Sequence, residues 1–95
     1  MEALTLSQVA LAPHGRILAG SPEMTVTAVG TDSRRVEENS LFVPLSGENF
    51  DGHHYIAAAL ESGAAACLTA VEPEELAEGK GYVLVEDTMQ ALGDL

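Results

Sequence analysis

Short runs of hydrophobic residues, separated by polar turns, predict alternating strands and helices in the second half of the chain. Three runs are expected to form strands: 41–45, 65–69 and 82–86. Each is followed by a segment with helical character: 53–62, 73–78 and 88–95. Strands that alternate with helices in this way are typical of an α/β fold, here a small sheet flanked by short helices.

The three predicted helices rest on signals of different strength. Residues 53–62 carry apolar side chains three and four positions apart, which are expected to form one buried stripe: Tyr55, Ile56, Ala59 and Leu60. Residues 73–78 offer only a proline at the first position and acidic residues in the first turn. Asp87 or Thr88 is expected to cap residues 88–95, which stay apolar in register to the last residue, so we expect this helix to continue in a longer chain.

The first half of the chain is predicted to form a helix, two strands and a long polar loop. Thr5 or Ser7 can cap a helix over 5–12, and Pro13 and Gly15 are expected to end it. The strands are expected at 15–20 and 24–29, and polar loops at 30–40 and 46–52.

Composition limits the possible partners and the compartment. The 95 residues suffice for one small domain. Lys and Arg number 4 against 15 Asp and Glu, a net charge of −11, so we expect binding neither to nucleic acid nor to anionic membranes. The single cysteine, Cys67, is expected to be a buried core residue. The sequence shows neither a signal peptide nor a membrane span, so a cytoplasmic protein is expected.

Two polar loops contain the candidate binding residues. Thr31-Asp32-Ser33-Arg34 directly follows a predicted strand, and a hydroxyl beside a guanidinium suits a phosphate group. The alternative is an Asp-Ser turn with a solvated arginine. The loop 47–53 lies between a strand and a helix, where amides of the helix N-terminus and two glycines suit an anion. Its alternative is an ordinary connection in which Asp51 caps the helix.

No catalytic residue and no metal site is predicted. His53 and His54 are adjacent, so on a helix they point about 100° apart and do not form a usual ligand pair. The chain has no glycine-rich loop ending in Lys-Ser or Lys-Thr to cradle a nucleoside triphosphate. Asp32 or Asp51 could serve a small hydrolase, but no ordered nucleophile–base pair accompanies them. A module whose acidic surface docks on a basic partner stays open as another alternative.

Several segments, taken together and in this order, carry a resemblance to a known family: Thr31–Arg34, Leu41–Glu48, Phe50–Ile56, 57–68 and 85–92. They resemble the N-terminal domain of Mur ligases, and the resemblance covers nearly the whole chain. Within this family, residues 47–53 and 87–92 are more similar to the ligases that add the D-alanyl-D-alanine dipeptide. The ligases that add the third amino acid are the alternative.

The resemblance implies a function in peptidoglycan synthesis. Mur ligases use ATP and magnesium to activate the terminal carboxylate of a UDP-N-acetylmuramoyl peptide as an acyl phosphate, and an amine then forms the peptide bond. The N-terminal domain holds the uridine diphosphate end. By matching positions, the substrate-binding residues would be Thr31, Ser33, Arg34, Gly47, Glu48, Asn49 and Phe50, and Phe50 could stack on the base. The related tripeptide-forming enzyme has a His-Gln pair in place of Glu48-Asn49.

The resemblance also implies a division of tasks within a longer chain. Residues 1–87 would be the UDP-sugar-binding domain, and 88–95 would begin a linker helix towards the covalently linked central and C-terminal domains. ATP and magnesium would act in those domains, so the 95-residue chain is expected to hold no cofactor and to be inactive alone.

Overall fold

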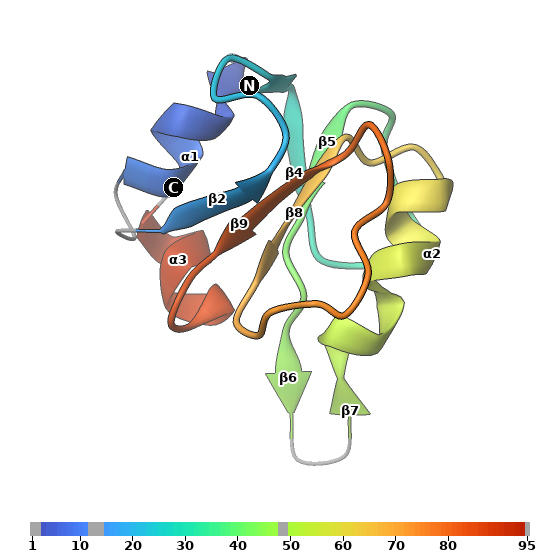
Figure 1. Cartoon of the computed structure of the whole chain (residues 1–95). Coiled ribbons are helices and arrows are strands. Elements are labelled where there is room, and N and C mark those ends of the chain that lie inside the picture. The colour runs from blue at the N-terminus through green and yellow to red at the C-terminus, as the bar shows by residue number, and fades with distance from the viewer. Residues whose placement is uncertain (1–2, 12–14, 48–49, 95) are drawn as a thin grey trace.

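A five-stranded sheet lies between two layers of helices in the computed structural model, which describes residues 3–11, 15–47 and 50–94 (Figure 1). The strand order is β2-β9-β8-β5-β4. The bounds are β2 (Arg16–Ala19), β4 (Ala28–Gly30), β5 (Ser40–Phe42), β8 (Ala66–Thr69) and β9 (Gly81–Leu84). The neighbours from β4 to β9 pair in parallel, whereas β2 pairs antiparallel with β9. The predicted α/β class is confirmed.

Each face of the sheet is covered by short helices (Figure 1). On one face lie α1 (Leu6–Leu11) and α3 (Thr88–Asp94), and on the other lie the 3-10 helix η1 (Gly52–Tyr55) and α2 (Ile56–Glu61). Strand β8 contributes to both cores, because Leu68 packs in the cluster with α1 while Cys67 packs in the cluster with α2. All four residues of β8 are buried, as its unbroken apolar sequence predicts.

Side-chain caps fix the beginnings of α1 and α3. Before α1, the Thr5 hydroxyl accepts a hydrogen bond from the Gln8 amide at 3.1 Å, and the Gln8 side chain accepts one from the Thr5 amide at 2.9 Å. This reciprocal pair is a capping box. Before α3, the Asp87 carboxylate accepts hydrogen bonds from the amides of Met89 and Gln90. Both caps agree with the sequence prediction, whereas Pro13, expected to end α1, lies outside the described residues.

The single strand predicted over 24–29 is divided into two. Strand β3 (Thr25–Val26) pairs with β1 (Leu4–Thr5) in a separate ribbon, and β4 joins the main sheet. The break falls at Thr27, whose amide donates to the carbonyl of Asn39 at 2.9 Å. Because this bond lies outside both ladders, the chain changes its pairing partner here without losing a backbone hydrogen bond.

The helix predicted over 73–78 is wrong, since this segment has no regular structure. Residues 74–79 are exposed, including Leu76, and the Ala77 amide donates to the Tyr82 hydroxyl instead of to a helical carbonyl. A proline start and acidic residues do not stabilise six residues that have no apolar face to pack. Within the described parts of the chain, no helix has the length and apolar character needed to cross a membrane.

Candidate functional site

The loop after β4 is held in a tight turn by Asp32. Its carboxylate accepts a hydrogen bond from the Arg34 amide at 2.9 Å, and it also accepts from Nε and Nη2 of the Arg34 guanidinium at 3.1 and 3.3 Å. The Asp32 carbonyl accepts from the Arg35 amide at 3.1 Å. The turn that an Asp-Ser sequence favours is therefore present, and the same aspartate orients the arginine.

Charge pairing in this loop shifts both partners toward their ionised forms. The hydrogen bonds from Arg34 lower the pKa of the Asp32 carboxyl from its ordinary 3.8, and the same contact raises the pKa of Arg34. The Arg34 side chain is nevertheless 87% exposed. Asp32 occupies two of its N–H groups, and a guanidinium carries five donors, so Arg34 can still bind an anion.

The second wall of the site is built at the base of a hairpin. Strands β6 (Ser46–Gly47) and β7 (Phe50–Asp51) pair antiparallel, and directly after them the Gly52 amide donates to the Leu45 carbonyl at 2.8 Å. A Cβ at Gly52 would lie 2.4 Å from that oxygen and 2.6 Å from the Leu45 nitrogen. Only glycine fits this close backbone approach, which fixes the start of η1 against the end of the preceding segment.

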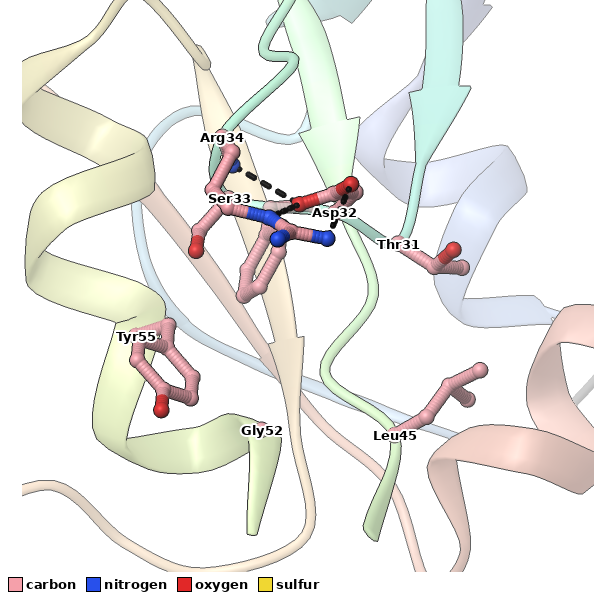
Figure 2. Close-up of a pocket in the computed structure, with 8 residues that line it drawn as sticks. Thr31, Asp32, Ser33, Arg34, Leu45, Gly52 and Tyr55 are labelled. Carbon is pink, nitrogen blue, oxygen red and sulfur yellow. Dashed lines mark hydrogen bonds and ion pairs between the residues drawn. The ribbon is translucent and has the colours of Figure 1, made fainter. Parts of the chain in front are cut away.

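These two parts of the chain enclose a pocket of about 380 Å³ at the carboxyl ends of β4 and β5. It is lined by Thr31, Asp32, Ser33, Arg34, Phe42, Leu45, Gly52 and Tyr55. Figure 2 shows residues 31–34 on one side and Leu45, Gly52 and Tyr55 on the opposite side. The position at the carboxyl ends of parallel strands is where α/β sheets usually bind small molecules, and the volume lies in the usual range for such sites.

Polar groups on one side of the pocket are available to a ligand. Within the described residues, the hydroxyls of Thr31 and Ser33 have no hydrogen-bond partner, and both side chains line the cavity. With the outer N–H groups of Arg34 they form a short row of donors and acceptors. Such a row suits a polar ligand with an anionic group.

His53 connects the helical wall to the sheet. Its Nε2 accepts a hydrogen bond from the amide of Ala70, directly after β8, at 2.9 Å. This bond assigns His53 a structural contact beside the pocket. In the described part of the chain, no three His, Cys, Asp or Glu side chains are grouped to hold a metal ion.

Only some of the predicted binding residues line the pocket. Thr31, Ser33 and Arg34 line one pocket, whereas Gly47 and the backbone of Phe50 belong to the hairpin beside it. Glu48 and Asn49 lie outside the described residues. The side chains of Phe50 and Asp51 are also outside the description, so the predicted stacking of Phe50 and the Asp51 cap stay predictions.

The helix predicted over 53–62 needs correction at its start. It begins with the 3-10 helix η1, and the α-helical part, α2, has only six residues. The anion site expected at its N-terminus stays a prediction. Tyr55 is 49% exposed and lines the pocket instead of joining the buried stripe. The 3-10 start changes the angular spacing of side chains, which explains why helical periodicity placed this ring in the core.

Comparisons with known proteins agree with this fold. The sequence profile described as "Mur ligase family, catalytic domain" matches residues 25–95. The UDP-N-acetylmuramoyl-L-alanyl-D-glutamate--2,6-diaminopimelate ligase of Bacteroides fragilis is 45% identical over 76 residues, which are 80% of this chain and 16% of that protein. The UDP-N-acetylmuramoyl-tripeptide--D-alanyl-D-alanine ligase of Bacillus subtilis is 38% identical over 92 residues, 96% of this chain and 20% of that protein.

A solved structure of a ligase has a domain with the same fold. The UDP-N-acetylmuramoylalanyl-D-glutamyl-2,6-diaminopimelate--D-alanyl-D-alanyl ligase of Acinetobacter baumannii matches all of this chain with a TM-score of 0.86 and 28% identity, and 21% of its own chain is covered. The chain belongs to the Mur ligase family. It spans about a fifth or less of the length of these relatives.

Proposed function

We propose that the pocket holds the uridine diphosphate end of a UDP-N-acetylmuramoyl peptide within a peptidoglycan-precursor ligase. The observation that carries the proposal is the row formed by Thr31, Ser33 and Arg34, which faces a wall containing Tyr55 across the cavity. Uridine diphosphate has a flat base and an anionic diphosphate. The pocket offers a counterpart to each, in a chain whose net charge of −11 otherwise repels anions.

Each part of the site has a role in this proposal. Arg34 binds the diphosphate, and Asp32 keeps its guanidinium oriented so that little side-chain freedom is lost on binding. Thr31 and Ser33 bind the uracil and the adjoining phosphate. Gly47, Glu48, Asn49 and Phe50 close the site from the hairpin, a role that rests on the family resemblance.

ATP and magnesium are assigned to other parts of the ligase. This assignment rests on the family resemblance, which implies that both act in the central and C-terminal domains. We propose that residues 1–87 are the substrate-holding domain and that α3 begins the linker to the ATP-binding domain. Ala91 of α3 is buried against this domain's core, which would hold the linker in a fixed direction.

The proposed reaction is addition of D-alanyl-D-alanine to the UDP-linked tripeptide. The relative in Bacillus subtilis and the structural neighbour in Acinetobacter baumannii, which match at least 96% of this chain, bear names of this reaction. Addition of the third amino acid is the second candidate, because the Bacteroides fragilis relative has the higher identity of 45%. An assay of phosphate release by the full-length ligase distinguishes the two reactions. D-Alanyl-D-alanine addition predicts release with UDP-linked tripeptide plus D-alanyl-D-alanine. Addition of the third amino acid predicts release with UDP-linked dipeptide plus diaminopimelate.

Binding of the nucleotide end can be measured on this chain by calorimetric titration. We expect saturable binding of UDP-N-acetylmuramic acid and of UDP, and much weaker binding of N-acetylmuramic acid, which lacks the nucleotide. Equal responses to the sugar with and without the nucleotide would contradict the proposal. A dependence on a basic protein partner, with no response to UDP, would instead favour the interaction module.

A further inference from the structure

Tyr55 is an aromatic side chain that the fold leaves half exposed beside the donors of the pocket. It belongs to η1, and its neighbours Ile56, Ala59 and Leu60 pack against the sheet while Tyr55 does not. Figure 2 shows its ring beside the helical wall, on the side of the pocket opposite residues 31–34. The ring therefore has little packing role in the core.

The other tyrosine of the chain, Tyr82, has a structural role and serves as a comparison for Tyr55. Tyr82 is 3% exposed, packs in the core on the α2 face, and its hydroxyl accepts a hydrogen bond from the Ala77 amide at 2.9 Å. Within the described residues, the Tyr55 hydroxyl has no such partner. A ring that is open on one side and fixed on a short helix is suited to bind a flat ligand.

The opposite wall of the pocket provides the polar contacts that a base needs. A pyrimidine base presents two π faces, which stack on aromatic rings, and an edge of carbonyls and N–H groups, which needs hydrogen-bond partners. Tyr55 offers the first kind of surface, and the hydroxyls of Thr31 and Ser33 offer the second. A bare phosphate would need the arginine and the hydroxyls but no ring.

We infer that Tyr55 is the residue on which the pyrimidine ring of the substrate stacks, and that it sets the preference of the pocket for an aromatic base. This inference rests on the proposed function. It assigns to Tyr55 the contact that the family resemblance suggests for Phe50. The two assignments differ in what each substitution does, so they can be separated.

The test uses this chain and its variants Tyr55→Leu, Tyr55→Phe and Phe50→Leu. The probes are UDP and 5,6-dihydro-UDP, whose reduced base keeps its carbonyls and N–H but loses the planar aromatic face. Affinities come from calorimetry, and proton NMR records the shifts of the base protons H5 and H6 on UDP. The amide signal of Ala70, which bonds to His53, reports that η1 keeps its place in each variant.

Stacking on Tyr55 predicts that Tyr55→Leu weakens UDP binding about 5- to 100-fold and abolishes the upfield shift of H5 and H6. Tyr55→Phe keeps the ring, so its affinity stays within about threefold of wild type and the upfield shift remains. Wild type is expected to prefer UDP over 5,6-dihydro-UDP about tenfold, and Tyr55→Leu is expected to lose this preference.

Two other results overturn the inference in distinguishable ways. If UDP binds wild type and the effects described for Tyr55→Leu appear in Phe50→Leu instead, or in neither variant, Tyr55 is not the stacking residue and the proposed function stands. If UDP does not bind wild type at all, the proposed function and the inference fail together.

Discussion

Two segments of the chain leave parallel strands at the same edge of the sheet, and each contains a carboxylate paired with an arginine. Residues 31–34 follow β4, and their pair joins Asp32 to Arg34. Residues 70–80 follow β8, and their pair joins Glu72 to Arg16 on β2 at 2.9 Å. Both arginines are largely exposed, at 87% and 68%. Exposure and pairing alone do not distinguish them.

The difference lies in what surrounds each pair. Residues 31–34 face a second wall, because Gly52 is locked to Leu45 and places η1 opposite them. Residues 74–79 are all exposed and carry three of the four acidic charges of 72–78 without an apolar face. A loop after a strand therefore becomes a candidate site only when another backbone segment is fixed across from it.

The largest expected effect comes from breaking that second wall. Gly52→Ala places a Cβ 2.4 Å from a backbone oxygen that cannot move aside, so we expect it to lower the free energy of unfolding by about 2–3 kcal/mol. Urea unfolding followed by circular dichroism measures the loss. The matched control is Gly30→Ala, where nothing lies within 4 Å of the added Cβ. Equal stabilities of the two variants would show that the contact is not rigid.

The next effect concerns the two arginines. In the full-length ligase, Arg34→Ala is expected to raise the KM for the UDP-linked substrate about ten- to hundred-fold, because it removes charge-assisted hydrogen bonds to the diphosphate. Ser33→Ala should raise it less, and the KM for ATP should stay nearly unchanged in both. Arg16→Ala is the matched control, since it removes an exposed, paired arginine outside the pocket. If Arg34→Ala and Arg16→Ala raise the KM for the UDP-linked substrate equally, the two segments do not differ in substrate binding.

A smaller effect is expected inside the sheet. Burial raises the pKa of the Cys67 thiol to about 12, so almost no thiolate forms at neutral pH and labelling by thiol reagents should be slow until the chain unfolds. Cys67→Ala is expected to cost about 1 kcal/mol, the loss of one small buried group. Labelling rates with and without urea test the first statement, and fast labelling of the native chain would refute the burial.

The smallest effect is the acid titration of the pocket loop. Because the pKa of Asp32 is lowered in the fold, its pairing stabilises the loop above the ordinary value of 3.8 and is lost as the pH falls through the lowered value. Carbon-13 NMR of the Asp32 carboxyl measures that midpoint. Arg34→Ala should raise it toward 3.8, and Arg35→Ala should raise it less, because Arg35 contributes only through its charge. An equal rise of the Asp32 pKa in both variants would contradict a hydrogen-bonded pair between Asp32 and Arg34.

Much of the fold could be predicted from sequence because its signals are local. The Thr5 cap, the Asp87 cap and the unbroken apolar run of β8 each act within a few residues, and each is present in the structure. The helix expected over 73–78 failed because helical signals are insufficient without a packing surface, which only the tertiary structure provides or withholds.

The candidate site could be predicted on one side only. Residues 31–34 form a local turn whose hydrogen bonds span two or three residues, so their chemistry is readable in sequence. The opposing wall depends on the contact between Gly52 and Leu45 and on the 3-10 geometry of η1, which turns Tyr55 toward the pocket. No periodicity in the sequence distinguishes that geometry from an ordinary helix start.

An NMR titration of the wild-type chain with UDP-N-acetylmuramic acid tests the proposed site most directly. Amide shifts are expected to concentrate on 31–34 and on the hairpin and η1 segment 47–55, with little change over 72–78. Shifts spread mainly over the acidic residues 72–78, while 31–34 stay unmoved, would contradict it.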